Sequence, residues 1–289
     1  MNQFHRIGVV GLGTMGGGIA QVFAMSGRDV VAVEADRTRA EAGVAAIGAF
    51  LDGGVARGKV SGEEKRAALA RITTVTSPGD LAGVDLVVES VTENLEVKRE
   101  VLAAAALAVG DETPIVTNTS ALSVTELAAL LPNPARVAGL HFFNPAPVMR
   151  TVEVVRALQT DQGLVDRLVA LVNSLDGKQP VVVKDRPGFL VNALLLPYLN
   201  DVIQEYDEGL ATAEDIDLAL KLGLGYRSGP LEMLDMIGLD VHLHATENAY
   251  AATSDDRYAP PPLLRQMVAA GRLGTKNGKG FRAGEKRTR

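Results

Sequence analysis

The sequence contains no cysteine, and only four of its 289 residues are histidine. The lack of cysteine excludes disulfide bonds, cysteine nucleophiles and thiolate metal ligands, and it fits the reducing environment of the cytoplasm. We therefore expect a cytoplasmic protein, and the sequence offers no convincing set of metal ligands. Because histidine is scarce, a histidine that lies near other polar side chains is a candidate for acid–base chemistry.

Positive charge is also limited: 29 lysine and arginine residues face 35 aspartate and glutamate residues, which gives a net charge of −6. This balance argues against nucleic acid or an anionic membrane surface as a partner. Hydrophobic residues make up 47% of the chain, so a core of normal size can form, and the length suggests about two domains. The first residues enter a strand pattern at once, and no targeting signal is evident.

Short apolar runs alternate with helical patterns in the first half of the chain. Strands are expected at residues 6–10, 29–34, 72–76, 84–89, 114–118 and 136–142. Apolar strands that alternate with helices are typical of a parallel sheet covered on both faces. The sequence therefore predicts an α/β, doubly wound domain of the Rossmann type.

The connection between the second and third expected strands, residues 35–71, is long enough for two helices. Ser61 and Glu64 have the spacing of a capping box, which would start the second of these helices. We therefore expect an αα-hairpin inserted into this domain, with Arg57 and Lys59 at its tip.

The pattern changes after the segment VVVKDRPGF. Residues 191–277 show helical patterns and no convincing strand, and Pro187-Gly188 interrupts the chain before them. We predict an N-terminal domain of residues 1–186 that binds the cofactor and an all-α domain of residues 187–289.

A glycine-rich turn, Gly11-Leu12-Gly13-Thr14-Met15-Gly16, follows the first expected strand and opens a helix. Gly11 permits the tight turn, Gly13 lets the backbone approach a pyrophosphate, and Gly16 allows close packing of helix and strand. The helix N-terminus, at Thr14 and Met15, offers free N–H groups to phosphate oxygens. This context predicts a dinucleotide site, and the alternative is a turn that binds no ligand.

Glu34 ends the second expected strand. A carboxylate at this position can accept hydrogen bonds from both ribose hydroxyls of NAD, and it would repel the 2′-phosphate of NADP. We therefore expect NAD as the cofactor. Arg37 and Arg39 follow closely and leave NADP open as the alternative.

Three polar segments fall at the ends of strands, where a doubly wound sheet binds its ligands. They are residues 88–93, 118–120 and 141–144. Each segment has a structural alternative, since Asn-Thr-Ser is often a helix cap or a turn, and Glu93 could favour the N-terminus of the next helix. Their occurrence on one rim of the sheet favours an active site.

His141 and Glu153 form the most specific pair of polar residues. Glu153 lies in the valine-rich segment TVEVV, so its carboxylate needs a partner if it is buried. His141 is the best candidate, because the nearby arginines can reach solvent. A carboxylate bonded to an imidazole fixes its tautomer and makes it a better base, as the oxidation of an alcohol by NAD requires. A histidine at a strand end is otherwise more often structural.

Several segments, in order along the chain, are similar to those of one enzyme family: GLGTMGGGIAQ, VVESVTENLEVK, TNTSALSVTELA, GLHFFNPAPVM, RPGFLVN, GPLEMLDMIGLD and GRLGTKNGKGF. Together they resemble the L-3-hydroxyacyl-CoA dehydrogenase family over nearly the whole chain, and most closely its short, single-function form, the bacterial 3-hydroxybutyryl-CoA dehydrogenases. The resemblance implies reversible, NAD-dependent oxidation of L-3-hydroxyacyl-CoA to 3-oxoacyl-CoA, with a place in fatty acid metabolism.

The resemblance also implies roles for individual residues. His141 would be the general base in oxidation and the general acid in reduction, and Glu153 would orient it. Ser120 and Asn192 would hydrogen-bond the substrate, and Asn144 would complete the polar network around the pair.

The resemblance further implies where the cofactor and CoA bind. In addition to the residues of the glycine turn, the resemblance implies that NAD is contacted by Glu34, Glu93, Lys98, Asn118 and Ser120. The hairpin tip, with Lys59 and Arg57, would meet the CoA phosphates, and the alternative for Lys59 is a solvated loop lysine. The helical domain would complete the substrate cleft and form a homodimer.

Two departures from the family pattern concern the acyl chain. Residues 226–230 read Tyr-Arg-Ser-Gly-Pro where members commonly have a His-Pro-Met-Gly-Pro-like segment, and Ala193 stands where they often have arginine. The acyl-chain preference therefore stays open, although a short chain such as 3-hydroxybutyryl is expected. Two other functions also stay open: a dehydrogenase of a free hydroxy acid, of the L-gulonate or L-carnitine type, and an NAD-binding protein without catalysis.

Overall fold

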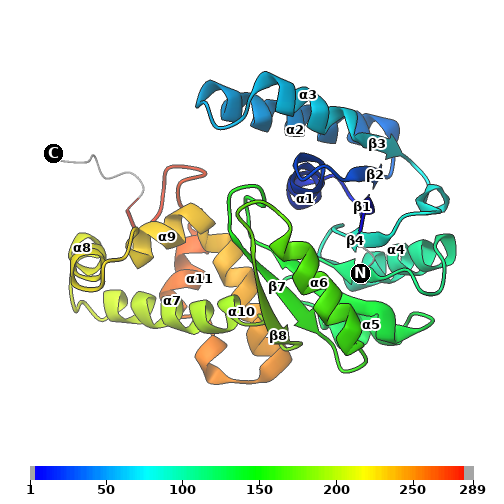
Figure 1. Ribbon diagram of the computed structural model, residues 1–289. Helices are drawn as coiled ribbons and strands as arrows, with labels where there is room; N and C mark the ends of the chain where they lie inside the picture. Colours follow the sequence, from blue (N-terminus) through cyan, green and yellow to red (C-terminus); the bar gives the residue numbers. More distant parts are fainter. Residues whose placement is uncertain (1–3, 283–289) are drawn as a thin grey trace. The chain divides into compact units, whose positions relative to one another are not determined.

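Figure 1 shows the computed structural model, which describes residues 4–282. The chain forms two compact units, Met1–Phe189 and Leu190–Arg289. The first unit combines strands and helices, whereas the second is helical, which confirms the predicted fold class.

The first unit is built on a single eight-stranded sheet. In chain order its strands are β1 (Arg6–Val10), β2 (Asp29–Val33), β3 (Ile72–Val75), β4 (Leu86–Glu89), β5 (Ile115–Thr117), β6 (Val137–Phe142), β7 (Thr151–Arg156) and β8 (Gln179–Lys184). Across the sheet they follow the order β3-β2-β1-β4-β5-β6-β7-β8. The first six strands in this order have the arrangement of doubly wound dinucleotide-binding sheets.

All neighbouring strands pair in parallel except β6 and β7, which are antiparallel. The six strands that the sequence predicts are therefore parallel to one another, as expected, and β7, to which the sequence analysis gave no direction, runs against them. The connection from Phe143 to Arg150 is too short for the helical crossover that a parallel pair needs, so the chain turns back on itself. This reversal places His141 directly opposite Glu153 in the strand register.

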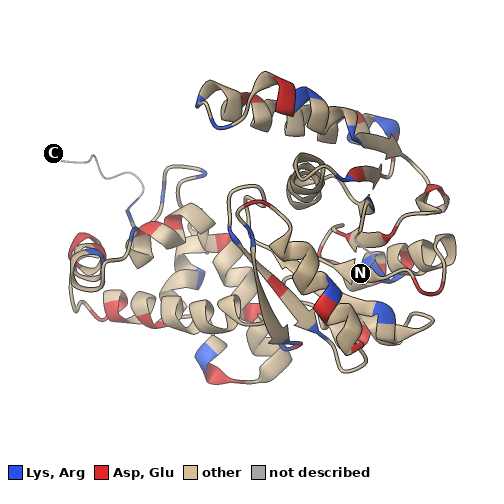
Figure 2. Ribbon diagram, in the orientation of Figure 1, with Lys and Arg blue, Asp and Glu red and all other residues tan. Residues whose placement is uncertain are grey.

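Helices cover both faces of the sheet (Figure 1). They are α1 (Thr14–Met25), α2 (Arg37–Ala56), α3 (Gly62–Ala70), α4 (Leu95–Ala108), α5 (Val124–Ala129) and α6 (Gln162–Asn173). Successive strand residues point to opposite faces, so Val9 joins the core cluster under α1, α2 and α6, and Val10 joins the cluster under α4 and α5. Figure 2 shows acidic and basic residues dispersed over the helices, as expected for their solvent-exposed faces.

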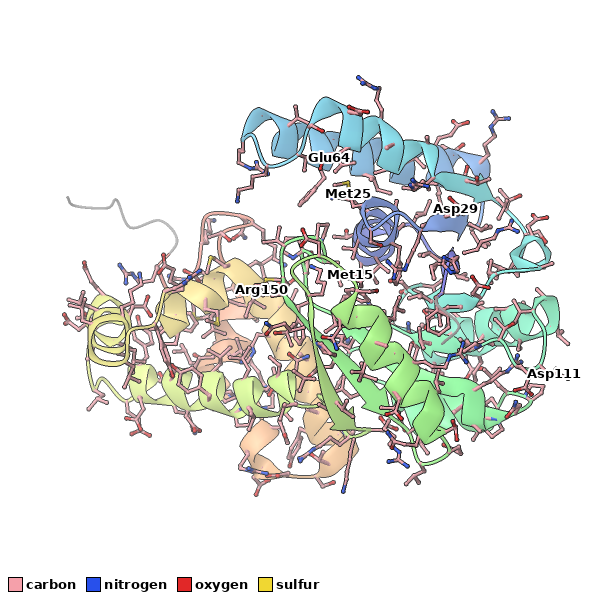
Figure 3. The ribbon with its side chains drawn as sticks, viewed as in Figure 1. Met15, Met25, Asp29, Glu64, Asp111 and Arg150 are labelled. Carbon is pink, nitrogen blue, oxygen red and sulfur yellow. The ribbon has the colours of Figure 1, made fainter. Side chains whose placement is uncertain are left out.

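The helices α2 and α3 form the predicted αα-hairpin. The hydroxyl of Ser61 accepts a hydrogen bond from the N–H of Glu64 at 3.1 Å, and the carboxylate of Glu64 accepts one from the N–H of Ser61 at 2.7 Å. Both halves of the predicted capping box are therefore present at the start of α3, where Figure 3 labels Glu64. Figure 3 also labels Met15, whose side chain packs against the core cluster under α1.

The described part of the second unit, residues 190–282, is helical apart from turns and one isolated β-bridge. Its α-helices are α7 (Val191–Asp207), α8 (Ala213–Leu224), α9 (Pro230–Ile237), α10 (Leu239–Thr253) and α11 (Pro262–Ala269). Leu199, Leu231 and Leu264, from three different helices, are fully buried in its core. Over residues 4–282, none of the helices combines the length and the apolar character needed to span a membrane.

A buried polar cluster lies inside the second unit. The side chain of His242 on α10 is 2% exposed, and its Nε2 lies 3.1 Å from Oδ1 of Asn200. The amide nitrogen of Asn200 donates to the hydroxyl of Thr246 at 2.9 Å, and that hydroxyl donates to the carbonyl of Tyr258 at 2.6 Å. Burial lowers the pKa of His242 from 6.5 to about 4, so the imidazole is neutral in the folded protein at neutral pH.

We expect the free energy of unfolding to fall as the pH is lowered from 6.5 to about 4. The unfolded chain binds a proton at His242 near pH 6.5, whereas the folded chain does so only near pH 4, so acid favours unfolding by up to about 3 kcal/mol. Urea unfolding over this pH range should show a smaller loss in His242→Gln. The control is His244→Gln, which alters an exposed ring on the same helix. The same pH dependence in His242→Gln and wild type would contradict the prediction.

Candidate active site

The loop between β1 and α1 is shaped to admit a phosphate-bearing ligand. Gly11 has a φ of +92°, and a Cβ atom on Gly16 would overlap the carbonyl oxygen of Gly11, so a larger side chain fits at neither position. At Gly13, by contrast, nothing lies within 4 Å of an added Cβ atom, and this residue caps α1 without a side-chain hydrogen bond. The N-terminus of α1 is therefore open to a ligand, as the pyrophosphate of a dinucleotide requires.

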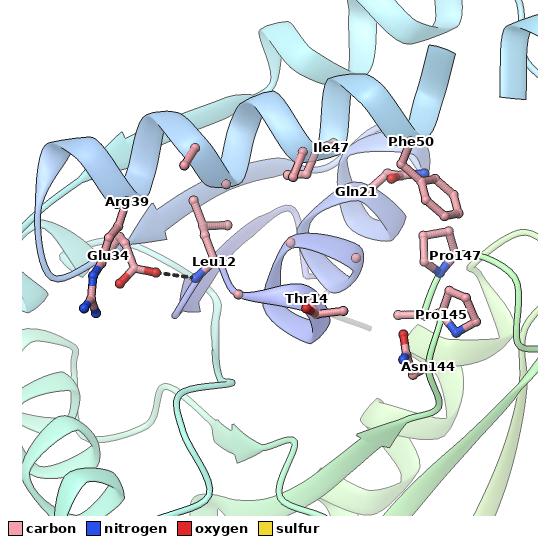
Figure 4. A pocket seen from close by; sticks show the side chains of 17 residues that line it. Leu12, Thr14, Gln21, Glu34, Arg39, Ile47, Phe50, Asn144, Pro145 and Pro147 are labelled. Carbon is pink, nitrogen blue, oxygen red and sulfur yellow. Dashed lines mark hydrogen bonds between the residues drawn. The ribbon is translucent and has the colours of Figure 1, made fainter. Parts of the chain in front are cut away.

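Glu34 follows β2, and its carboxylate lies against the same loop (Figure 4). It accepts hydrogen bonds from the backbone N–H of Leu12 at 2.8 Å and from that of Ala35 at 2.9 Å. These bonds fix the carboxylate near the N-terminus of α1, where the ribose next to a pyrophosphate would lie. Arg37 is engaged elsewhere, since its Nε donates to Glu41 at 2.7 Å.

A buried ion pair lies at the carboxyl ends of β4 and β5. The side chains of Glu89, at the end of β4, and Lys98, on α4, are each 1% exposed, and their Oε1 and Nζ atoms lie 2.7 Å apart. The other carboxylate oxygen of Glu89 accepts a hydrogen bond from the hydroxyl of Thr117 at 2.6 Å. Nζ of Lys98 also donates to the carbonyl of Val91 and lies 3.3 Å from Glu93. These contacts offset the unfavourable free energy of removing the two charges from water.

Glu93 ties the loop after β4 to the loop after β5. One of its carboxylate oxygens accepts hydrogen bonds from the N–H groups of Ser120 and Ala121, both at 3.0 Å. The same oxygen also accepts a hydrogen bond from the hydroxyl of Thr119. Burial alone would raise the pKa of Glu93, but Lys98 and these hydrogen bonds outweigh it and hold the pKa below its usual value. The ionised Glu93 therefore fixes the backbone of Ser120, whose side chain is exposed at the rim.

His141 and Glu153 face each other across the antiparallel pair of β6 and β7. Nδ1 of His141 lies 2.7 Å from Oε2 of Glu153, and the side chain of Glu153 is fully buried. An ionised carboxylate accepts a hydrogen bond, so it favours a proton on Nδ1 and leaves Nε2 of the neutral ring as a proton acceptor. A pair of this kind can take a proton from an alcohol and return it.

The asparagines of the predicted site follow β5 and β6. The side-chain oxygen of Asn118 accepts a hydrogen bond from the N–H of Phe142 at 2.8 Å, which joins the ends of the two strands. Asn144 is exposed, and a cis peptide bond links it to Pro145. The structure therefore gives Asn118 a partner in the backbone and leaves Asn144 at the surface of a cavity.

This cavity, of about 680 Å³, lies between α1, α2 and the loop of residues 144–147. Figure 4 shows Glu34 and Arg39 toward one end of it, and Asn144 and Phe50 toward the other. Its lining is mostly apolar, with a few polar groups at the ends, which is typical of sites for extended small ligands. The cavity connects the dinucleotide loop with the loop that follows His141.

Lys178 is a residue that the sequence reasoning missed. It lies just before β8, is 7% exposed, and its Nζ donates to the carbonyls of Ala146 and Met149, both at 2.6 Å. Burial lowers its pKa, although Asp176 opposes this effect. Lys178 therefore holds the loop that forms one wall of the cavity. Glu89, the centre of the buried ion pair, lies in one of the three polar segments that the sequence analysis singled out, but no role was predicted for it.

Some predicted substrate residues lie outside the lining of this cavity. Arg57 and Lys59 are exposed in the turn between α2 and α3. Asn192 belongs to the second unit, where it is half-buried in the first turn of α7. Within residues 4–282, no three or more histidine, aspartate or glutamate side chains are grouped so that they could hold a metal ion.

Two protein families match the chain, one after the other. Residues 6–186 match the family described as "3-hydroxyacyl-CoA dehydrogenase, NAD binding domain". Residues 188–284 match the family described as "3-hydroxyacyl-CoA dehydrogenase, C-terminal domain". The two matches together span nearly the whole chain.

Individual relatives agree with these matches. A 3-hydroxybutyryl-CoA dehydrogenase of Mycobacterium tuberculosis is 42% identical over 281 residues, which cover 97% of this chain and 98% of that protein. The 3-hydroxyadipyl-CoA dehydrogenase of Escherichia coli is also 42% identical over 281 residues, which cover 97% of this chain and 59% of that protein. The crystal structure of (S)-3-hydroxybutyryl-CoA dehydrogenase from Ralstonia eutropha has a TM-score of 0.92 at 43% identity, covering 96% of this chain and 98% of that chain.

We expect Lys98→Met to destabilise the first unit strongly. The substitution keeps an unbranched side chain but leaves Glu89 as a buried, uncompensated charge, which costs about 3–5 kcal/mol. The double variant Glu89→Gln/Lys98→Met removes both charges and should recover most of this loss. Urea unfolding tests both variants, with Lys184→Met as the control at an exposed position of β8. Equal unfolding free energies for the single and double variants would contradict the prediction.

Proposed function

The chain belongs to the 3-hydroxyacyl-CoA dehydrogenase family, and we propose that it oxidises short-chain L-3-hydroxyacyl-CoA thioesters, such as 3-hydroxybutyryl-CoA, and catalyses the reverse reduction. As a member of this family it is an NAD-dependent oxidoreductase that acts on a CH–OH group. The observation that carries the proposal is the pair of His141 and Glu153, which offers a proton acceptor on the rim that also holds the dinucleotide loop.

We assign the proton step to His141. In oxidation its Nε2 takes the proton of the 3-hydroxyl group, and the carboxylate of Glu153 stabilises the imidazolium that forms. NAD, when bound, supplies the acceptor for the hydride that leaves C3. In reduction the imidazolium returns the proton to the 3-oxo oxygen, so the same pair serves both directions.

Ser120, Asn144 and Asn192 are proposed to hold the substrate. Ser120 is exposed while Glu93 fixes its backbone, so its hydroxyl can be presented to a substrate oxygen without loss of position. Asn144 borders the cavity three residues after His141 and offers an amide on the same rim. The assignment of Asn192 is supported by the family pattern GFLVN.

The cofactor site is proposed to comprise the turn of residues 11–16 with Glu34, Glu93, Lys98 and Asn118. The open N-terminus of α1 suits the pyrophosphate, and the fixed carboxylate of Glu34 suits the adenosine ribose. Glu93 and Lys98 stand at the end of β4, on the side of the sheet's rim expected for the nicotinamide.

The end of the cavity that Phe50 and Asn144 border, away from Glu34, is proposed to take part of the CoA moiety. Its apolar lining suits a pantetheine arm, and it begins beside Asn144, close in the chain to His141. Phe50 lines it on the part of α2 that leads to the hairpin tip. Lys59 and Arg57 at that tip offer positive charge to the CoA phosphates.

The second unit is proposed to complete the substrate cleft and to mediate formation of a homodimer in the cytoplasm. Large apolar side chains remain exposed on its helices, among them Leu194, Leu222 and Met236. A second copy of the chain could cover such a surface. The lack of cysteine supports the cytoplasmic location.

The proposed reaction is tested by mixing the protein with NADH and acetoacetyl-CoA and following the loss of NADH absorbance. We expect turnover with acetoacetyl-CoA and none with free acetoacetate. Turnover with a free acid but with no acyl-CoA would replace the proposal by a hydroxy-acid dehydrogenase, and NADH binding without turnover of either would favour a non-catalytic protein. Since one relative is a 3-hydroxyadipyl-CoA dehydrogenase, an ω-carboxylated 3-oxoacyl-CoA should be compared with acetoacetyl-CoA.

Glu153→Gln should lower kcat by about 10²–10⁴-fold and leave the affinity for NADH nearly unchanged. Glutamine has the same shape, but its amide can donate to Nδ1, which favours the tautomer with the proton on Nε2 and so removes the proton acceptor. Steady-state kinetics of the oxidation of 3-hydroxybutyryl-CoA by NAD measure the first effect, and NADH titrations measure the second. The control is Glu100→Gln, at an exposed position of α4. Near-normal kcat in Glu153→Gln would remove this residue from the mechanism.

A further inference from the structure

The imidazole of His141 packs against two phenylalanine rings of the first unit. The ring centroid of Phe143 lies 4.6 Å from that of the imidazole, and the ring centroid of Phe189 lies 5.5 Å from it. The contact with Glu153 holds the imidazole at one edge, through Nδ1, and the torsion about the Cβ–Cγ bond has broad minima. Two ring contacts restrict that rotation.

Phe189 has a backbone conformation that aromatic residues seldom adopt. Its φ is +48°, in the left-handed region, which costs a residue with a Cβ atom on the order of 1–2 kcal/mol. The side chain is nevertheless 3% exposed and belongs to a small core cluster with Val124 and Val155. Glycine would relieve the backbone but would leave His141 without this ring, so the strain points to a function of the ring.

The segment that leads to Phe189 is anchored to the rim. Asp185, directly after β8, accepts hydrogen bonds from the hydroxyl of Ser123 at 2.9 Å and from the N–H of Thr125 at 2.7 Å. The N–H of Phe189 then donates to the carbonyl of Arg186 at 2.9 Å, which closes a turn. These bonds anchor the backbone that carries Phe189, the last residue of the first unit.

We propose that Phe189, together with Phe143, is a positioning residue for proton transfer. The two rings hold the imidazole of His141 so that Nε2 is directed at the substrate, while Glu153 fixes the tautomer. Neither ring exchanges a proton, and both act through the imidazole. This inference rests on the proposed function of His141 as the proton acceptor.

Phe189→Leu keeps an apolar side chain and removes the ring. We expect kcat with acetoacetyl-CoA to fall about tenfold to a hundredfold, because a small displacement of a reacting group has an effect of this size. The KM for NADH should stay unchanged, and the pH dependence of kcat should shift because the surroundings of the imidazole change. Phe143→Leu, at a half-buried position that should tolerate leucine, tests the same contact if Phe189→Leu does not fold.

The matched control is Phe23→Leu. Phe23 is a fully buried residue of α1 whose ring packs against Phe142, so its replacement removes a core ring at another place. We expect this variant to lose stability but to keep the wild-type kcat and pH profile. A merely structural role of Phe189 would give the same result in Phe189→Leu.

Nuclear magnetic resonance of the histidine side chains gives a readout that does not depend on turnover. The chain has only four histidines, and neighbouring aromatic rings displace the imidazole resonances of the one they contact. The His141 signals should move in Phe189→Leu and in Phe143→Leu, and should stay in place in Phe23→Leu. Unchanged His141 signals and an unchanged pH profile in both test variants would overturn the inference. A wild-type protein that does not reduce acetoacetyl-CoA would overturn the proposed function, while the resonances would still decide whether the rings position the imidazole.

Discussion

The antiparallel pairing of β6 with β7 is the constraint on which the candidate active site depends. It sets His141 opposite Glu153, and because strand side chains alternate between the faces, a shift of one residue would turn one of the two away from the other. The short connection of residues 143–150 makes the reversal necessary. Lys178 then binds two carbonyls of that connection, so the turn that creates the pair also has a fixed shape.

The loops at the rim are each held by a side chain from a neighbouring part of the chain. Glu34 binds the loop after β1, Glu93 binds the loop after β5, and Asn118 binds the backbone of β6. These bonds go to backbone N–H groups, and Glu93 also binds the hydroxyl of Thr119, which leaves the exposed side chains of Ser120 and Asn144 available to a ligand. A rim built in this way needs little rearrangement on binding, so less of the binding free energy is lost to ordering.

The sequence predicts those features whose cause lies within a few neighbouring residues. The glycine turn, the capping box of Ser61 and Glu64, and the carboxylate in a valine-rich strand belong to this group. The direction of β7 was not predicted, because an apolar run has the same pattern in both directions, although the shortness of residues 143–150 indicates the reversal. Lys178 and Phe189 were missed for another reason. Their contacts join segments distant in the sequence, and the left-handed φ of Phe189 follows from tertiary packing.

The candidate active site contains two sets of buried charged side chains, the pair of Glu89 with Lys98 and the carboxylate of Glu153 beside His141. An ion pair such as Glu89 with Lys98 is no more stabilising than a well-packed apolar pair, but it fixes the ends of two strands through directed hydrogen bonds. Glu153 differs, because its fully buried carboxylate faces an imidazole, whose charge would change in the proposed proton transfer. Burying the carboxylate of Glu153 costs free energy. A protonated imidazole offsets this cost more fully than a neutral one, because it carries the opposite charge. In the proposed mechanism, the buried carboxylate of Glu153 is therefore complementary to the protonated imidazole of His141, which is the state that a catalyst of alcohol oxidation must stabilise.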